Sequence, residues 1–270
     1  MTTLFYHAPF QSTFAIETDC NLLTKQLYLK YGKYISTEKA HIDYHIVITK
    51  KNGNYLFQTE AFVQPSLHPL IDLDHFFFEN TIYDPRIFAL HGGAIEWKNK
   101  CFIFLAPTTA GKTTLTAYLT NFGAGYITDD CILLDRTEMT VHPYATPLHL
   151  RDGGLSVLKK QGITLANLQA LEDGAEFKRY IYTPHNCAVT EQPLASIFFI
   201  ERTTHENCLM PMSATERMTE MMKAPITPYE INTDYLRFLA RLIQFPCHRL
   251  RYCNMEYVKD VIQNECASKL

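Results

Sequence analysis

A short apolar run, a loop of small residues and the sequence Gly-Lys-Thr-Thr follow one another between residues 101 and 115. Residues 102–105 predict a buried strand, and residues 115–119 predict the first turns of a helix. A strand, a small-residue loop, Gly-Lys-Thr and a helix are the layout of a phosphate-binding P-loop. In that layout the backbone N–H groups of the loop and of the helix N-terminus converge on one anion. A nucleotide is therefore the first ligand to consider, in a protein of the α/β class.

The loop suggests a role for its polar side chains. Lys112 is expected to reach the β- and γ-phosphates of ATP, and the Thr113 hydroxyl to hold Mg²⁺. The usual pattern opens with Gly, whereas this loop opens with Ala106, which resists a positive φ, so we expect the loop to open differently. The alternative is an ordinary strand-to-helix turn with Lys112 at the surface. The residues expected to surround the phosphates are Ala106, Pro107, Thr108, Thr109, Ala110, Gly111, Lys112, Thr113 and Thr114.

Two acids and a histidine are candidates for the chemistry. Asp129 and Asp130 end a short apolar run one strand–helix–strand distance after the loop. Adjacent side chains on an extended chain point to opposite faces, so one carboxylate is expected to serve the metal and the other the substrate. The alternative for this pair is a solvated turn. His91 lies in Leu-His-Gly-Gly-Ala, where the small residues Gly92 and Gly93 leave room for close backbone approach. His91 is either a hydrogen-bonded structural residue or a group that orients a catalytic carboxylate.

Composition narrows the classes of protein that fit. The 270 residues are 47% hydrophobic and 20% charged, which is enough apolar sequence for a sizeable core. The net charge of −3 and the lack of a long basic run argue against nucleic acid as a partner. Eight cysteines without a Cys-x-x-Cys pair make a zinc or iron–sulfur site a weak interpretation. No apolar run reaches the ~20 residues of a membrane span, and no signal peptide is evident, so the expected location is the cytoplasm.

The chain is predicted to contain two parts. Residues 1–84 form a small α+β region, with a helix over Asn21–Tyr31 and a helix over 69–83. Strands over 45–49 and 55–58 are expected to be joined by a turn at Lys51-Asn-Gly-Asn54.

Residues 85–270 form the part that carries the loop. One strand is expected over 87–96, and another over 125–128 that continues through 131–134 after the two acids. A helix over 213–223 is expected to start with a capping box between Ser213 and Glu216.

The loop region resembles the catalytic domain of HPr kinase/phosphorylase and its shorter relatives. The resemblance rests on Leu-His-Gly-Gly-Ala, the strand, loop and helix, Thr-Asp-Asp, and a Pro-rich stretch over 141–151 that ends in a basic residue. It covers about residues 86–225. It implies the fold shared with ATP-dependent phosphoenolpyruvate carboxykinases and a kinase that phosphorylates a serine hydroxyl of a protein. Some shorter relatives phosphorylate a precursor peptide in gene clusters for modified peptides. Family members often form oligomers, which leaves a homo-oligomer open here.

The resemblance also implies roles for individual residues. His91 matches the histidine that contacts the catalytic aspartate, Asp129 matches the catalytic base, and Asp130 matches a metal-side carboxylate. Arg151 matches an arginine in a family segment that runs Glu-Ile-Arg-Gly. His149 stands where that segment has Glu, so one metal-side acid of the family is replaced.

Lys178 and Arg179 are further candidates, either as a clamp on the γ-phosphate or as a solvated basic turn. The leading functional hypothesis is an ATP-dependent kinase that acts on a Ser or Thr hydroxyl of a peptide or small protein, with the N-terminal strands offering an edge to the peptide. A nucleotide-binding regulatory protein with little turnover and a small-molecule kinase are the alternatives, because fold alone does not select the acceptor.

Overall fold

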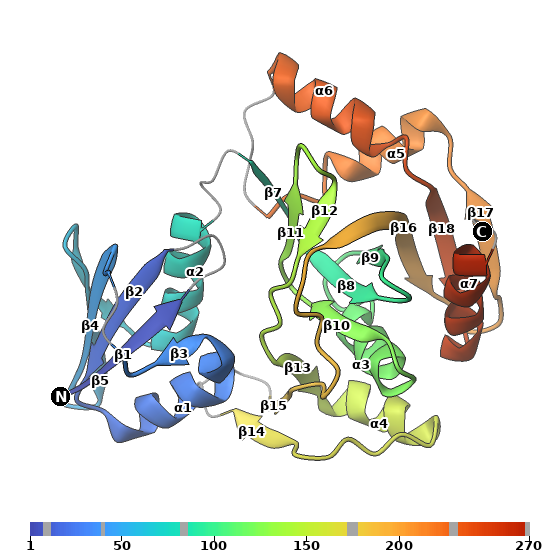
Figure 1. Ribbon diagram of the computed structural model, residues 1–270. Helices are drawn as coiled ribbons and strands as arrows, with labels where there is room; N and C mark the ends of the chain where they lie inside the picture. The colour runs from blue at the N-terminus through green and yellow to red at the C-terminus, as the bar shows by residue number, and fades with distance from the viewer. Residues whose placement is uncertain (8–11, 39–40, 82–85, 172–177, 227–231, 268–270) are drawn as a thin grey trace. The chain divides into compact units, whose positions relative to one another are not determined.

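The computed structural model describes residues 1–7, 12–38, 41–81, 86–171, 178–226 and 232–267 (Figure 1). The chain is a mixed α/β protein that divides into two compact units. The first unit comprises Met1–Pro85, His149–Asp152 and Leu165–Thr183, and the second comprises Arg86–Leu148, Gly153–Thr164 and Pro184–Leu270. The two later segments of the first unit are absent from the two-part division predicted from the sequence. Within the described residues no helix is both long and apolar enough to cross a bilayer.

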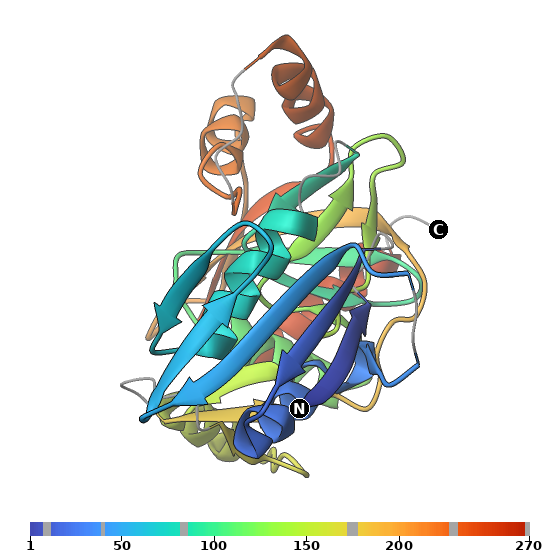
Figure 2. The same ribbon diagram turned by 90° about the vertical axis from the view of Figure 1, so that its left-hand side faces the viewer.

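The first unit is built on a six-stranded sheet, which faces the viewer in Figure 2. The strand order is β3-β1-β2-β4-β5-β6. Aromatic rings of the sheet and of both helices meet in one core, where Tyr6 stacks on Phe77 at 4.1 Å between centroids and meets the edge of Tyr31 at 5.3 Å. The elements are β1 (Thr2–His7), β2 (Thr13–Thr18), α1 (Asn21–Tyr31), β3 (Ile35–Ser36), β4 (Tyr44–Lys51), β5 (Asn54–Gln58), β6 (Val63–Ser66) and α2 (Pro69–Thr81).

The predicted elements of this region are found in the structure. The helix over Asn21–Tyr31 is confirmed at both ends, and β4 and β5 form the expected hairpin. Its turn uses Asn52 and Gly53 with φ of 51° and 85°, the backbone that matches the twist of a two-residue hairpin. The helix predicted over 69–83 is α2, and its last two predicted residues lie outside the described residues.

A buried charge cluster joins the two helices of the first unit. The Lys30 side chain is 7% exposed and forms an ion pair with Asp74, and the Tyr31 hydroxyl donates to the same carboxylate. Burial, followed by the Asp74 charge, raises the pKa of Tyr31 well above its ordinary value, so this hydroxyl stays a donor. We expect Asp74→Asn to lower the free energy of unfolding by about 3 kcal/mol, because it leaves the Lys30 ammonium buried without a counter-charge.

Urea unfolding of the full chain measures this loss. Asp234→Asn is the matched control, since Asp234 pairs with Arg237 at 3.0 Å but is 81% exposed, and the change should stay within about 0.5 kcal/mol. Equal stabilities of the two variants would contradict the role of the cluster.

The second unit is built on a nine-stranded sheet. Its main path runs β10-β8-β9-β16-β12-β11-β7, and β18 pairs with β16 and β17. The strands β9, β16 and β18 are parallel neighbours. The strands are β7 (Ile87–Leu90), β8 (Gly92–Glu96), β9 (Cys101–Leu105), β10 (Gly125–Thr128), β11 (Ile132–Asp135), β12 (Thr140–His142), β16 (Gln192–Arg202), β17 (Cys208–Pro211) and β18 (Cys247–Tyr252).

Helices cover both faces of these three parallel strands. One face carries the apolar core with α5 (Ala214–Met221) and α6 (Thr233–Leu242), to which Ile103, Ile197 and Cys247 contribute. The opposite face carries α3 (Lys112–Asn121) and α7 (Met255–Ala267), which contact each other. The capping box predicted for α5 is confirmed, because Glu216 N–H donates to Ser213 Oγ and Ser213 N–H donates to the Glu216 carboxylate.

A short helix and a three-stranded sheet complete the chain. The helix α4 spans Asp152–Lys160, and the sheet has the order β13-β15-β14. Its strands are β13 (Leu148–Arg151), β14 (Gln169–Leu171) and β15 (Arg179–Tyr182).

Two strand predictions are wrong in one respect each. Residues 87–96 form two strands that break at His91, whose N–H donates to Ala224 O at 2.9 Å instead of to a neighbouring strand. The strand β11 does not continue β10, because β10 pairs with β8 whereas β11 pairs with β7 and β12. The two breaks lie together, since His91 Nδ1 is 3.1 Å from the Asp130 carbonyl oxygen. Both changes of direction therefore occur where the candidate functional residues are.

Candidate active site

The loop over Ala106–Gly111 joins the buried strand β9 to α3. Two of its residues have left-handed backbone, Thr109 with φ of 72° and Gly111 with φ of 94°, and Gly111 caps the helix. Ala106 is not among the described non-glycine residues with positive φ, so alanine meets no backbone strain at the opening of the loop. The helix α3 therefore begins at Lys112. The first backbone N–H groups of this helix, which have no partner within it, lie at the loop.

Lys112 lies inside the loop. It is only 6% exposed, and its Nζ donates to Ala106 O at 2.8 Å and to Pro107 O at 3.3 Å. Burial lowers the pKa of Lys112, while the charges of Asp129 and Asp130 oppose that shift. Lys112 is therefore not the surface lysine of the alternative interpretation, while phosphate binding by the loop stays a prediction.

Asp129 is a buried carboxyl group that lies near the side chains of Thr113 and Thr116. It is 3% exposed, and neither carboxylate oxygen has a hydrogen-bond partner among the described residues. Burial first, and then the Asp130 charge, raises the pKa of Asp129 to about 8, while Thr113, Lys112 and Thr116 act in the opposite direction. A buried carboxylate without a partner is costly, and such groups concentrate at functional sites.

Gly93 leaves the space that Asp129 and α3 occupy. A Cβ at this position would lie 2.7 Å from Thr116 Oγ1 and 3.6 Å from Asp129 Oδ1. We expect Gly93→Ala to lower the free energy of unfolding by about 1–3 kcal/mol, because Thr116 is fully buried and has little room to move. Thermal unfolding measures the loss.

Two further variants test that reason. Gly153→Ala is the matched control, since its Cβ would meet no atom within 4 Å, and its stability should not fall. Adding Thr116→Ala to Gly93→Ala should restore part of the loss, and a purely additive double variant would contradict the steric explanation.

His91 and Asp130, the other two candidates for the chemistry, differ from Asp129 in their contacts and exposure. His91 Nδ1 donates to the Asp130 carbonyl oxygen at 3.1 Å, because a carbonyl only accepts. The contact thus goes to the backbone after Asp129 and not to the Asp129 carboxylate that the resemblance implies. Asp130 is exposed whereas Asp129 is buried, so the two side chains point in different directions, as an extended pair predicts.

The remaining predicted residues belong to the first unit. Arg151 ends β13, Arg179 begins β15, and Lys178 is exposed with its ammonium 5.1 Å from the centroid of the Tyr180 ring. His149 precedes Arg151, and burial, helped by the charges of Lys30 and Arg179, lowers its pKa to about 3. All of these lie in the first unit, whereas the loop lies in the second, and their role toward a nucleotide stays a prediction.

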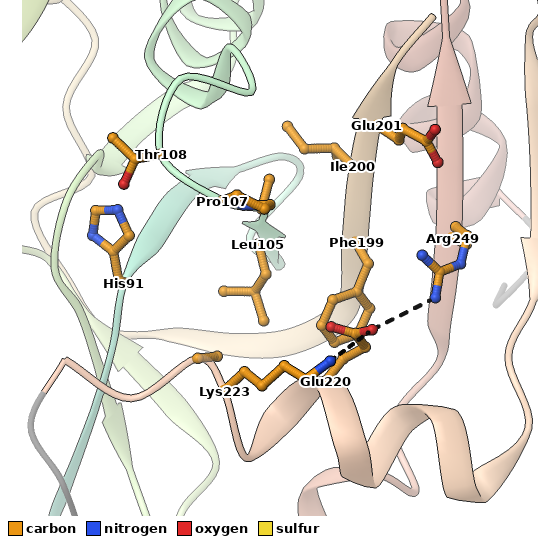
Figure 3. Close-up of a pocket in the computed structure, with 12 residues that line it drawn as sticks. His91, Leu105, Pro107, Thr108, Phe199, Ile200, Glu201, Glu220, Lys223 and Arg249 are labelled. Carbon is orange, nitrogen blue, oxygen red and sulfur yellow. Dashed lines mark ion pairs between the residues drawn. The ribbon is translucent and has the colours of Figure 1, made fainter.

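A cavity of about 470 Å³ adjoins the opening of the loop, and sequence reasoning missed it (Figure 3). Its walls come from the ends of β9 and β16, from β18 and from the segment after α5, which are far apart in the sequence. No local motif signals such a site. The lining residues are His91, Leu105, Ala106, Pro107, Thr108, Phe199, Ile200, Glu201, Glu220, Lys223, Ala224 and Arg249.

The residues of the loop fit a magnesium nucleotide better than a protein-bound metal. Among the described residues no group of three or more His, Cys, Asp or Glu side chains is placed to hold a metal ion. Mg²⁺ needs few protein ligands when phosphates and water supply the rest. The Thr113 hydroxyl, Asp130 and the enclosed ammonium of Lys112 are the kinds of groups such a ligand requires.

Comparison with known proteins leaves the family unassigned. No protein-family model matches the chain. No curated protein matches it either. Among solved structures, it is similar to the Hpr(Ser) kinase/phosphatase from Coxiella burnetii, with 11% sequence identity, 67% of this chain and 92% of that chain covered, and a TM-score of 0.35.

Proposed function

We propose that the protein is an ATP-dependent kinase that transfers the γ-phosphate to a Ser or Thr hydroxyl of a peptide or small protein. The observation that carries this proposal is the Asp129 carboxylate, which is buried without a partner beside the enclosed Lys112 and the N-terminus of α3. A phosphate-binding loop next to a poised carboxylate supplies both requirements of phosphoryl transfer, which are positioning of the phosphates and a proton acceptor.

Each residue has one task in this reaction. The loop N–H groups and Lys112 hold the phosphates, and Thr113 and Asp130 would hold Mg²⁺, which neutralises charge on the phosphates when bound. Asp129 takes the proton in its ionised form, which a pKa of about 8 makes the major form only above about pH 8. The proton comes from the acceptor hydroxyl, whose oxygen bonds to the γ-phosphorus as the bond from that phosphorus to the leaving ADP oxygen breaks. His91 fixes the backbone of the acid pair by its bond to the Asp130 carbonyl oxygen, which makes it a positioning residue.

A small-molecule kinase is the second candidate. The observation in its favour is the cavity of about 470 Å³ beside the loop, a volume that suits a small acceptor as well as one or two residues of a peptide. A precursor peptide of a modified natural product is the peptide acceptor that the sequence resemblance suggests.

The proposal is tested in two steps with the full chain. Calorimetry with ATP and Mg²⁺ measures nucleotide binding, and mass spectrometry follows phosphate transfer to Ser-containing peptides and to small hydroxy compounds. We expect binding and transfer to require both ATP and Mg²⁺. Nucleotide binding without transfer to any acceptor would favour the regulatory protein, and no binding would contradict the loop assignment.

A further inference from the structure

The cavity beside the loop lies where parallel sheets bind ligands. Phe199 is paired with Leu105 on one side and with Arg249 on the other, so the three side chains form a row across neighbouring parallel strands. Leu105 is the last residue of β9, and the row therefore lies near the carboxyl ends of β9 and β16. Ligands of open α/β sheets bind at such ends.

The walls of the cavity connect it to the acid pair. His91 lines the cavity and its Nδ1 donates to the Asp130 carbonyl oxygen, while its N–H donates to the carbonyl oxygen of Ala224, another lining residue, at 2.9 Å. Ile226 N–H donates in turn to Ala89 O at 3.2 Å, which secures the same wall to β7. Hydrogen bonds thus connect the cavity lining to the acid pair proposed for proton transfer and to β7.

The same walls indicate which substrate the cavity receives. Its loop residues are Ala106–Thr108, at the start of the loop, and the lining does not include Lys112–Thr114, which would hold the phosphates. A ligand here lies at the start of the loop and next to His91, on the side away from Lys112–Thr114. The acceptor, rather than the phosphate chain of the nucleotide, is the substrate expected on this side.

The cavity lining contains two cationic side chains that pair with the same acidic side chain. Glu220 is the common partner of two cations, with Lys223 Nζ at 3.5 Å and Arg249 at 3.8 Å, as Figure 3 shows for the latter. Both distances exceed a normal hydrogen bond, so neither cation is fully used by this carboxylate. Glu201, the other acid in the lining, is bound by Arg251 at 3.0 Å.

Glu216, a further acid near Arg249, already has hydrogen-bond donors. The Glu216 carboxylate accepts from the N–H and hydroxyl of Ser213 at 2.8 and 2.7 Å. Lys223 and Arg249 therefore share the carboxylate of Glu220. The same cavity is lined by the apolar side chains of Leu105, Pro107 and Phe199. The group that completes this arrangement is a second carboxylate on an otherwise apolar or neutral body.

We infer that this cavity binds the phosphate acceptor through a carboxylate held by Lys223 and Arg249, so that the substrate is a hydroxyl compound carrying a nearby carboxylate. This inference rests on the proposed kinase function. Two sources share this chemistry, an Asp or Glu side chain next to the reacting residue of a peptide, and the free carboxylate of a small hydroxy acid. Glu220 competes for the same cations and limits how tightly the acceptor binds.

The test measures acceptor preference with the full chain and saturating ATP and Mg²⁺. One arm uses a library of short synthetic peptides with one Ser and each amino acid in turn at the flanking positions. The other arm uses glycerate and L-serine against glycerol and serinamide, which lack the carboxylate. Wild type is expected to prefer the acidic member of one of these sets by about tenfold.

Two variants act in opposite directions. Arg249→Gln should raise the KM for the preferred acidic acceptor about tenfold and abolish the preference over the neutral analogue. Glu220→Gln should lower that KM several-fold, because it frees both cations, and a merely structural role predicts no such gain. The KM for ATP should not change in either. Arg237→Gln is the matched control, because Arg237 is an exposed arginine paired with Asp234 in the same unit.

Each outcome separates this inference from the kinase proposal. Transfer to neutral acceptors as good as to acidic ones, or an unchanged KM in both variants, would overturn the inference and leave the kinase intact. Nucleotide binding with no transfer to either set would overturn it as well, and would favour the regulatory protein. Loss of ATP binding in wild type is the result that contradicts the kinase itself.

Discussion

Asp129→Asn is expected to reduce phosphate transfer by on the order of 10²-fold or more while ATP–Mg²⁺ affinity stays close to that of the wild type. The change keeps the shape of the side chain and removes the proton acceptor. It also removes a carboxylate that is 3% exposed and has no hydrogen bond, so we expect the variant to unfold at the same or a higher temperature than the wild type.

Single-turnover transfer and thermal unfolding of the same samples check both parts. Asp130→Asn is the matched comparison, since Asp130 is exposed, and it should shift the Mg²⁺ dependence more than the stability. Near-normal transfer by Asp129→Asn would assign the proton acceptor to Asp130 or to solvent.

Lys112→Ala is expected to weaken ATP–Mg²⁺ binding by about 10–100-fold, which corresponds to the loss of about 1.5–3 kcal/mol of charge-assisted hydrogen bonding. The ammonium already lies inside the loop at the Ala106 and Pro107 carbonyl oxygens, so a small movement brings it to a phosphate. Calorimetry with ATP and Mg²⁺ measures the affinity.

Lys159→Ala, at an exposed position in the last turn of α4, is the matched control and should bind ATP like the wild type. Unchanged affinity and turnover in Lys112→Ala would exclude phosphate binding by the loop. A circular dichroism spectrum equal to that of the wild type ensures that the loss reflects the side chain and not the fold.

Local sequence signals predicted the elements that local interactions determine. The turn at Asn52 and Gly53, the capping box at Ser213 and the helix after Gly111 each depend on residues within a few positions of one another. The position of Asp129 beside Lys112 also followed from the spacing of a strand, a loop and a helix, although its catalytic role stays a prediction.

Features that depend on distant contacts were not predictable from one sequence. The break at His91 results from a hydrogen bond to Ala224, more than a hundred residues away. The cavity combines Leu105, Phe199 and Arg249 through the pairing of three strands, and no pattern in the sequence reports that register. Gly93 was noted as a small residue, but the reason that it must be small, the buried Thr116 hydroxyl, is tertiary.

The composition of the first unit has a consequence for synthesis and for experimental design. Because it includes Leu165–Thr183, this unit is complete only after the ribosome has released that segment, long after its own helices and most of its strands have emerged. A protein that starts near residue 85 would retain the three-stranded sheet of β13, β14 and β15 without the six-stranded sheet of the same unit, and a protein that stops near residue 85 would lack the three-stranded sheet. The chain should therefore be expressed whole, because a cut near residue 85 divides the first unit and a cut after residue 183 divides the second. Proteolysis of nascent chains should show late protection of the N-terminal region.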